Sequence, residues 1–215
     1  MTGIFSLKQS DRKPRNTLSP VSYLKSRNPQ TAVFYDTFTD ANGTSLLVHT
    51  PDIDTVGAGW LRVGAQVWTI NGNKVGHVQS FGNAGEAYAN CGVADGAITC
   101  DVTVSTSGGV DLAGVAFRLT DTNNLWKVVV ARATGAFVIF ERNAGVDINR
   151  TQKLVPIVGG ATYTIKVILS GQSIVATLDG ADQIPYALAS FNQAVTNHGI
   201  ESKSDDIFDD FKVVA

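Results

Sequence analysis

Short β-prone runs, separated by turn residues about every ten positions, constrain the fold of this 215-residue chain more than any other feature. Val, Ile, Thr and aromatic residues dominate the runs, and these residues pack well on a pleated surface. The runs lie at 32–38, 46–49, 60–63, 67–70, 74–78, 97–105, 112–119, 125–132, 136–141, 163–169, 173–178 and 207–214. So many short strands predict an all-β sandwich, jelly roll or barrel.

Turn residues between these runs indicate which strands pair. Asn71-Gly72 separates 67–70 from 74–78, and Asn-Gly is the strongest short hairpin signal because both residues tolerate positive φ. Residues 133–135 and 170–172 separate two later pairs of runs in the same way, and Asp179-Gly180 marks a further turn.

Hydrophobic alternation predicts which strand faces are buried. Apolar residues fall at 98, 100, 102 and 104, and again at 163, 165, 167 and 169, so each of these strands should have one buried and one wetter face. Residues 128–130 and 136–140 are apolar on both faces, which predicts a central or covered position. No long window has a helical period, and 186–195 is the best candidate for a short helix.

Composition excludes several classes of protein. With 44% hydrophobic and 17% charged residues, the chain is too apolar to be disordered as a whole. Its net charge of −2 argues against a uniformly basic nucleic-acid binder. No apolar run approaches the roughly 20 residues of a membrane span, and the N-terminus lacks the apolar stretch of a secretory signal, so we expect no membrane partner.

The charge is distributed unevenly along the chain. Residues 1–32 hold six basic residues and one acidic residue, a net charge of +5, whereas 33–215 carries −7. The first segment also holds three of the six prolines and has no sustained hydrophobic period. We therefore predict an extended basic N-terminal arm at 1–32 and a single β domain at 33–215. The candidate partner-binding residues of the arm are Phe5, Lys8, Arg12, Lys13, Arg15, Tyr23, Lys25 and Arg27.

Three segments resemble the concanavalin A-like, or laminin-G-like, jelly-roll family. Residues 34–44 read FYDTFTDANGT, which is similar to the family's entry strand, and are followed by HTPD at 49–52 and Gly59-Trp60. Residues 117–128 (FRLTDTNNLWKV) resemble its central hairpin, and 207–213 (IFDDFKV) resemble its closing strand. The resemblance covers about 33–215 and implies a concanavalin A-like jelly-roll sandwich preceded by the arm.

The domain looks most like those on tailed-bacteriophage virion proteins, and the basic arm resembles the anchoring arms of capsid decoration (cement) proteins. This resemblance implies a non-enzymatic structural protein of the virion, assembled in the host cytoplasm. The arm would bind the major capsid protein or other virion subunits, or a second copy in a homo-oligomer. The alternative is a glycan-binding, lectin-like module on a phage tail or fibre. Nucleic acid is a less suitable partner for the arm, because the body is acidic.

We expect no catalytic site. Glycosidases on this fold use two carboxylates, and in the family one strand reads E-x-D-x-x-E. The only glutamates here are Glu86, Glu141 and Glu201, and none is followed by an acid two residues later. The three histidines lie in no nucleophile motif, and Gly-x-Ser-x-Gly is absent.

Other residue types leave alternatives open. Trp60, Trp68 and Trp126 are candidates for stacking on sugar rings, although large aromatics in a sandwich more often belong to the core. Cys91 and Cys100 are either two buried thiols, which we favour, or a disulfide.

We expect no cofactor. The family often holds a structural Ca²⁺, for which Asp36 and Asp210 are the candidates, because the family pairs its first and last strands. The acids at 205, 206, 209 and 210 form a local cluster, and solvated acids that protect a sheet edge are the alternative interpretation.

Overall fold

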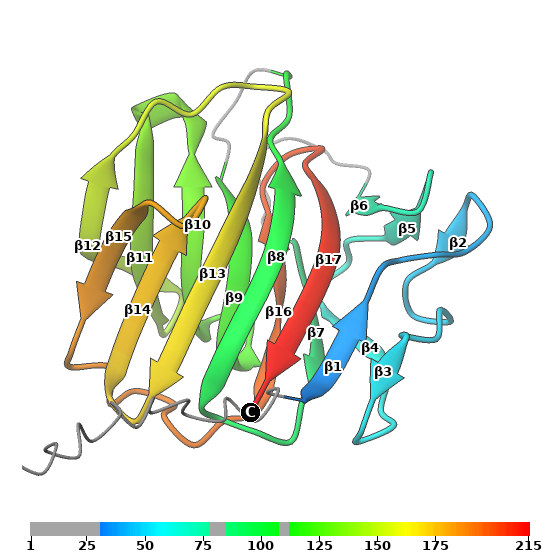
Figure 1. The fold of residues 1–215 in the computed structure, drawn as a ribbon, viewed down its shortest axis with the longest axis horizontal. Helices are drawn as coiled ribbons and strands as arrows, with labels where there is room; N and C mark the ends of the chain where they lie inside the picture. Colours follow the sequence, from blue (N-terminus) through cyan, green and yellow to red (C-terminus); the bar gives the residue numbers. More distant parts are fainter. Residues whose placement is uncertain (1–30, 78–84, 108–111) are drawn as a thin grey trace, which may run out of the picture.

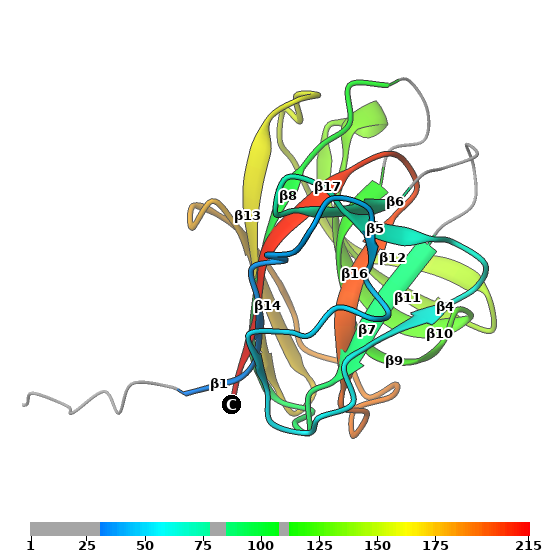
Figure 2. The same ribbon diagram turned by 90° about the vertical axis from the view of Figure 1, so that its right-hand side faces the viewer.

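A computed structural model describes residues 31–77, 85–107 and 112–215. These residues form two sheets that lie face to face (Figures 1 and 2). Within each sheet, every pair of neighbouring strands is antiparallel. The predicted all-β jelly-roll sandwich is therefore confirmed. All but the last two residues of the predicted arm lie outside the described ranges.

The ten-stranded sheet has a main path of eight strands with two more beside it. Its order is β15 (Asp182–Tyr186), β14 (Ser173–Leu178), β13 (Thr162–Ser170), β8 (Gly96–Thr103), β17 (Ile207–Val214), β6 (Val75–His77), β5 (Trp68–Ile70) and β2 (Thr44–Ser45). β1 (Ala32–Asp36) pairs with both β17 and β3 (Ile53–Asp54). The chain thus enters the domain beside its own C-terminal strand.

The seven-stranded sheet carries the site described below. Its order is β12 (Val146–Leu154), β11 (Ala136–Asn143), β10 (Asn124–Ala131), β9 (Leu112–Asp121), β16 (Asn197–Ser202), β7 (Gly85–Asn90) and β4 (Trp60–Val63). Three hairpins join β9 to β12 in sequence, and a single 3₁₀ turn (Arg132–Thr134) lies between β10 and β11.

Both sheets contribute alternate side chains to one core between them. Ile98, Cys100 and Val102 of β8 face Val115 and Phe117 of β9 across this layer. The predicted alternation in β8 and β13 is confirmed, because their apolar positions are buried or partly buried and the intervening ones are not buried. Burial of these apolar faces is the main source of the domain's stability.

The predicted hairpins β5–β6, β10–β11 and β13–β14 all form. In the first, the Asn71 N–H donates to the Lys74 carbonyl at 2.8 Å, so the central residues of the turn are Gly72 and Asn73, with positive φ values of 61° and 56°. The turn therefore lies one residue later than the Asn71-Gly72 signal places it. The Asp179-Gly180 turn joins β14 to β15.

Two local predictions are wrong. Residues 46–48 form a turn, not a strand: the Val48 N–H donates to the Ser45 carbonyl, and only Leu46 is buried. Residues 186–195 form no helix, because β15 extends to Tyr186 and 191–194 are a turn. The Trp126 indole N–H donates to the Phe191 carbonyl at 2.8 Å, which fixes this segment to the core as a loop.

The runs that are apolar on both faces form β10 and β11, each of which has a neighbouring strand on both sides in the seven-stranded sheet. Their inward residues join the main core. Their outward residues Val129, Ala131, Ala136 and Val138 form a separate cluster on the opposite face. No helix among the described residues is long and apolar enough to cross a membrane.

Candidate functional site

A hollow of about 270 Å³ lies over β9–β12, on the face of the seven-stranded sheet that points away from the core. Its floor consists of Ala131, Ala136 and Val138, which are 5%, 1% and 2% exposed although they do not belong to the core between the sheets. Small floor residues surrounded by larger ones create the depression. The lining residues are Leu112, Ala131, Ala133, Thr134, Ala136, Val138, Phe140, Asn149, Gln152 and Leu154.

The edge of the hollow combines apolar and amide side chains from β12. Leu154 is 72% exposed, and Asn149 and Gln152 are exposed beside it. The Asn149 side-chain amide donates to Gln152 Oε1 at 2.6 Å. The remaining amide N–H and carbonyl groups are available to a ligand. None of the described residues that line the hollow carries a charge.

A buried ion cluster lies on the same sheet and links five of its strands. Lys127 of β10 donates to Glu201 of β16 at 2.8 Å and to Asp147 of β12 at 3.0 Å. Arg142 of β11 contacts Asp147 at 2.7 Å and Glu86 of β7 at 2.9 Å. Lys127, Glu86 and Glu201 have no exposed surface.

The two glutamates of the cluster are direct cross-strand neighbours in the β7–β16 pair. Burial and the negative charge of Glu201 together raise the pKa of Glu86 to about 7, against the opposing effect of Arg142. Burial also opposes ionisation of Asp147, but its bonds with Arg142 and Lys127 prevail and lower its pKa to about 2. Glu201 Oε2 is buried without a hydrogen-bond partner among the described residues.

Phe140 connects the hollow to the ion cluster. Its ring is partly buried, lines the hollow, and has Lys127 Nζ 5.5 Å from its centroid. The cation thus faces the ring that borders the hollow. The outward face of β9–β12 therefore offers an aromatic and aliphatic surface, two amides, and a rigid charged support beside it.

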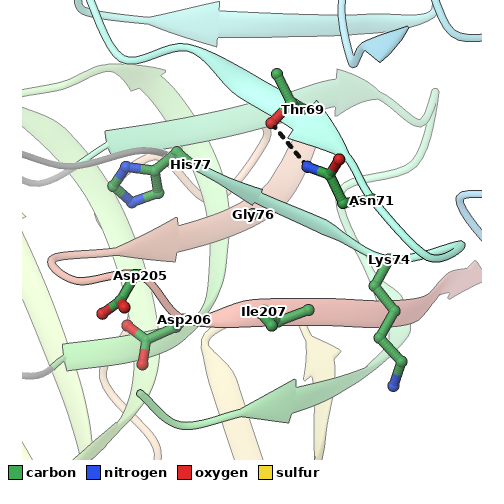
Figure 3. Close-up of a pocket in the computed structure, with 8 residues that line it drawn as sticks. All are labelled: Thr69, Asn71, Lys74, Gly76, His77, Asp205, Asp206 and Ile207. Atoms are coloured by element: carbon green, nitrogen blue, oxygen red, sulfur yellow. Dashed lines mark hydrogen bonds between the residues drawn. The ribbon is translucent and has the colours of Figure 1, made fainter. Parts of the chain in front are cut away.

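A second hollow, of about 270 Å³, lies between β5–β6 and the segment that leads into β17 (Figure 3). It contains His77, Asp205 and Asp206. The Asp206 carboxylate accepts bonds from the Ser105 N–H and the Ser202 hydroxyl, and burial lowers the pKa of His77 to about 4. Nowhere in the described ranges do three His, Cys, Asp or Glu residues meet in a group able to hold a metal ion.

The two calcium candidates lie on paired strands, as expected, but in different environments. Asp36 has no exposed surface, and its carboxylate accepts bonds from the Trp60 indole at 2.6 Å and the Phe38 N–H at 2.6 Å, and contacts His49 at 3.0 Å. Asp210 is exposed and accepts a bond from the Tyr35 hydroxyl at 2.9 Å. The Asp36 carboxylate is thus hydrogen-bonded to protein groups, and its partners differ from the partner of Asp210.

The three tryptophans belong to the core. Trp60, Trp68 and Trp126 are 2%, 2% and 0% exposed, so none presents a ring face to a sugar. Trp60 packs edge-on against Phe34 and Phe211, which belong to the entry and closing strands.

The cysteines are free and buried, which confirms the favoured interpretation. Cys91 follows β7 of one sheet and Cys100 lies in β8 of the other.

The site that the structure assembles was not among the candidates predicted from the sequence. The arm candidates Phe5 to Arg27 lie outside the described residues. The search for a carboxylate pair along one strand missed Glu86 and Glu201, which meet across two strands. The available signal was the pair of runs that are apolar on both faces, since an outward apolar surface in the middle of a sheet indicates a ligand site or an interface.

No family model and no curated protein matches the chain. Solved structures share its fold. The carbohydrate-binding module CBM66 from Bacillus subtilis aligns with a TM-score of 0.58 and 16% identity, over 72% of this chain and 92% of that one. A Bacillus subtilis protein of unknown function with a galectin-like fold aligns with a TM-score of 0.54 and 13% identity, over 84% and 97%. The GH43 protein BlXynB from Bacillus licheniformis aligns with a TM-score of 0.54 and 15% identity, over 84% of this chain but 39% of that one.

At these identities the likeness concerns the fold alone. The chain has the concanavalin A-like, galectin-like sandwich that its entry, hairpin and closing segments predicted. The virion and capsid assignments remain predictions.

Proposed function

We propose that this protein is a non-enzymatic glycan-binding module whose ligand occupies the hollow over β9–β12. The observation that carries the proposal is the presence of an uncharged hollow, with a partly buried phenylalanine and two exposed amides, on the solvent side of a sheet. Ligand sites are typically concave and mostly apolar, with a few polar groups that fix orientation.

Sugar chemistry suits this arrangement. A pyranose has an apolar C–H face and a rim of hydroxyls, so it would pack on Phe140 and exchange hydrogen bonds with Asn149 and Gln152. The buried ion cluster ties β10, β11 and β12 to β16 and β7, which holds the floor of the hollow rigid. A preorganised site loses less entropy when it binds.

The structural neighbours support this choice over the capsid role for the folded body, since one is itself a carbohydrate-binding module and another has a galectin-like fold. Fold similarity alone does not assign function, so the proposal depends on the hollow.

The absence of catalysis is part of the proposal. Glu86 and Glu201 are adjacent carboxylates, as glycoside hydrolysis requires, but Arg142 and Lys127 bind them at 2.9 Å and 2.8 Å and neither has exposed surface. Their position inside an ion cluster favours a structural role.

A glycan array followed by titration calorimetry with the best ligand tests the function. We expect saturable binding that weakens about tenfold or more in Phe140→Ala and in Gln152→Ala, because each loses a direct contact. Gln183→Ala is the matched control, since Gln183 is an exposed glutamine of β15 in the other sheet, and it should bind like the wild type. The absence of binding to any glycan, or equal loss in the control, would refute the proposal.

The charge of the N-terminal segment supports a second, separate proposal about location. Residues 1–32 carry +5 against −7 in the body, which suits an arm that anchors to an acidic surface such as a virion shell subunit. Such anchoring is compatible with glycan binding by the body.

A further inference from the structure

Resting on the proposed function, we infer that the hollow over β9–β12 selects a neutral 6-deoxy sugar, in which a methyl group replaces the usual hydroxymethyl group. The inference names the substrate class of the same site. It follows from the distribution of polar and apolar groups around the hollow.

The floor of the hollow cannot satisfy a buried hydroxyl. Seven of the ten lining residues are apolar, and the deepest of them, Ala136 and Val138, are almost fully buried. A hydroxymethyl group pressed against this floor would lose its water without gaining a partner, which is unfavourable. A methyl group at the same place gains by leaving water.

The two amide groups of the hollow lie on one side of it. Asn149 and Gln152 both come from β12, and their mutual hydrogen bond uses one donor and one acceptor of the pair. The Thr134 hydroxyl, in the turn between β10 and β11, donates to the Ala131 carbonyl at 3.4 Å and retains only its acceptor capacity. These groups serve a few hydroxyls on one edge of a sugar and leave the opposite edge against aliphatic carbon.

Charge complementarity indicates a neutral ligand. No charged residue is among the described residues that line the hollow. Lys127, the cation that faces the Phe140 ring, is bound to Glu201 and Asp147 and has no exposed surface. A uronic acid or a sulfated sugar would therefore bury or approach charge without a free partner.

Calorimetry on the full chain with matched pairs of methyl glycosides tests the inference. The pairs are L-fucose with L-galactose, L-rhamnose with L-mannose, and D-quinovose with D-glucose, and each pair differs only by one hydroxyl. We expect at least one deoxy member to bind about tenfold more tightly than its partner, the discrimination that one group gives in an apolar pocket.

A nearly isosteric variant locates the effect. Val138→Thr places a hydroxyl in the floor with little change in volume, and it should reduce the preference for the deoxy member at least threefold. Val175→Thr, at a partly buried valine of β14 in the other sheet, should leave the preference unchanged. Thermal unfolding of both variants checks that each is folded.

The outcomes separate this inference from the function on which it rests. Equal or tighter binding of the hydroxylated members, or array binding confined to charged or fully hydroxylated glycans, overturns the deoxy-sugar inference and leaves glycan binding intact. A preference that persists in Val138→Thr also overturns it. If the protein binds none of the glycans on the array, the proposed function itself is refuted.

Discussion

Glu86 and Glu201 face each other directly in the β7–β16 pair, where like charges normally destabilise a sheet. Arg142 binds Glu86 and Lys127 binds Glu201, which offsets the repulsion. Burial nevertheless raises the pKa of Glu86 to about 7, so this carboxyl changes its charge near neutral pH.

The free energy of unfolding should depend on pH through the titration of Glu86. The pKa of Glu86 is higher in the folded state than its ordinary value of 4.5, so folding favours the protonated form. Its contribution is therefore fully present below pH 4.5 and is lost as the pH rises through about 7. Urea unfolding between pH 6.5 and pH 8, above the ordinary pKa of the buried His77 and His198, should show a free energy of unfolding that falls with pH and falls less in Glu86→Gln. An unchanged slope in this variant would contradict the expected titration.

Removal of one cation from the ion cluster should be costly. Lys127→Met leaves Glu201 buried without its partner, and breaking a buried pair typically destabilises by about 3–5 kcal/mol. The matched control is Lys153→Met, because the Lys153 side chain is 48% exposed in its pair with Asp182 and such pairs contribute at most about 1 kcal/mol. Similar losses in the two variants, measured by denaturant unfolding, would show that the cluster is not structural.

At the scale of strands, β9 and β16 approach their neighbours at glycines. A Cβ added to Gly114 would lie 2.1 Å from the Val128 carbonyl oxygen, and one added to Gly199 would lie 1.9 Å from that of Ala87. Gly114 pairs with Glu201, and Ala116 on the same strand pairs with Lys127. Small residues on β9 thus leave room for the Lys127 side chain to reach across this strand to Glu201.

Alanine at these glycines should disturb the sheet. Gly114→Ala and Gly199→Ala force backbone atoms apart, and overpacking of this kind costs about 1–3 kcal/mol or more. Gly76→Ala is the milder comparison, since its added Cβ would meet the Asp206 carbonyl oxygen at 3.1 Å. Thermal unfolding should rank Gly76→Ala as the most stable of the three, and the reverse order would contradict the close approach.

At the scale of the whole molecule, the strand that follows the proposed anchor and the proposed glycan site belong to different sheets. β1, which follows the N-terminal segment in the sequence, lies in the ten-stranded sheet (Figure 2). The hollow lies on the outward face of the seven-stranded sheet. An anchor attached through β1 would leave the hollow free to meet a glycan.

Deletion of residues 1–32 tests this division of roles. The body should remain folded, because its core is complete from β1 Phe34 onward, and glycan binding should persist. Incorporation into virions should be lost, because the basic anchor is absent. Normal incorporation of the truncated chain would refute the anchoring role, and loss of glycan binding would show that the segment contributes to the sugar site.

Hydrophobic alternation and turn residues predict the fold class, most strands and the tight hairpins, because these signals act between residues that are close in the chain. The same signals did not predict β2, β3, β7, β12, β15 and β16. In β12, for example, no residue is buried, so the strand has no clear hydrophobic pattern and its pairing depends on β11.

The packing of the two sheets sets which face of β10 and β11 meets the core and which forms the hollow. Only the tertiary structure brings Glu86 next to Glu201 and Lys127 across β9. Such contacts join distant parts of the chain, and their energy depends on burial and exclusion of water, which arise only when the two sheets have packed.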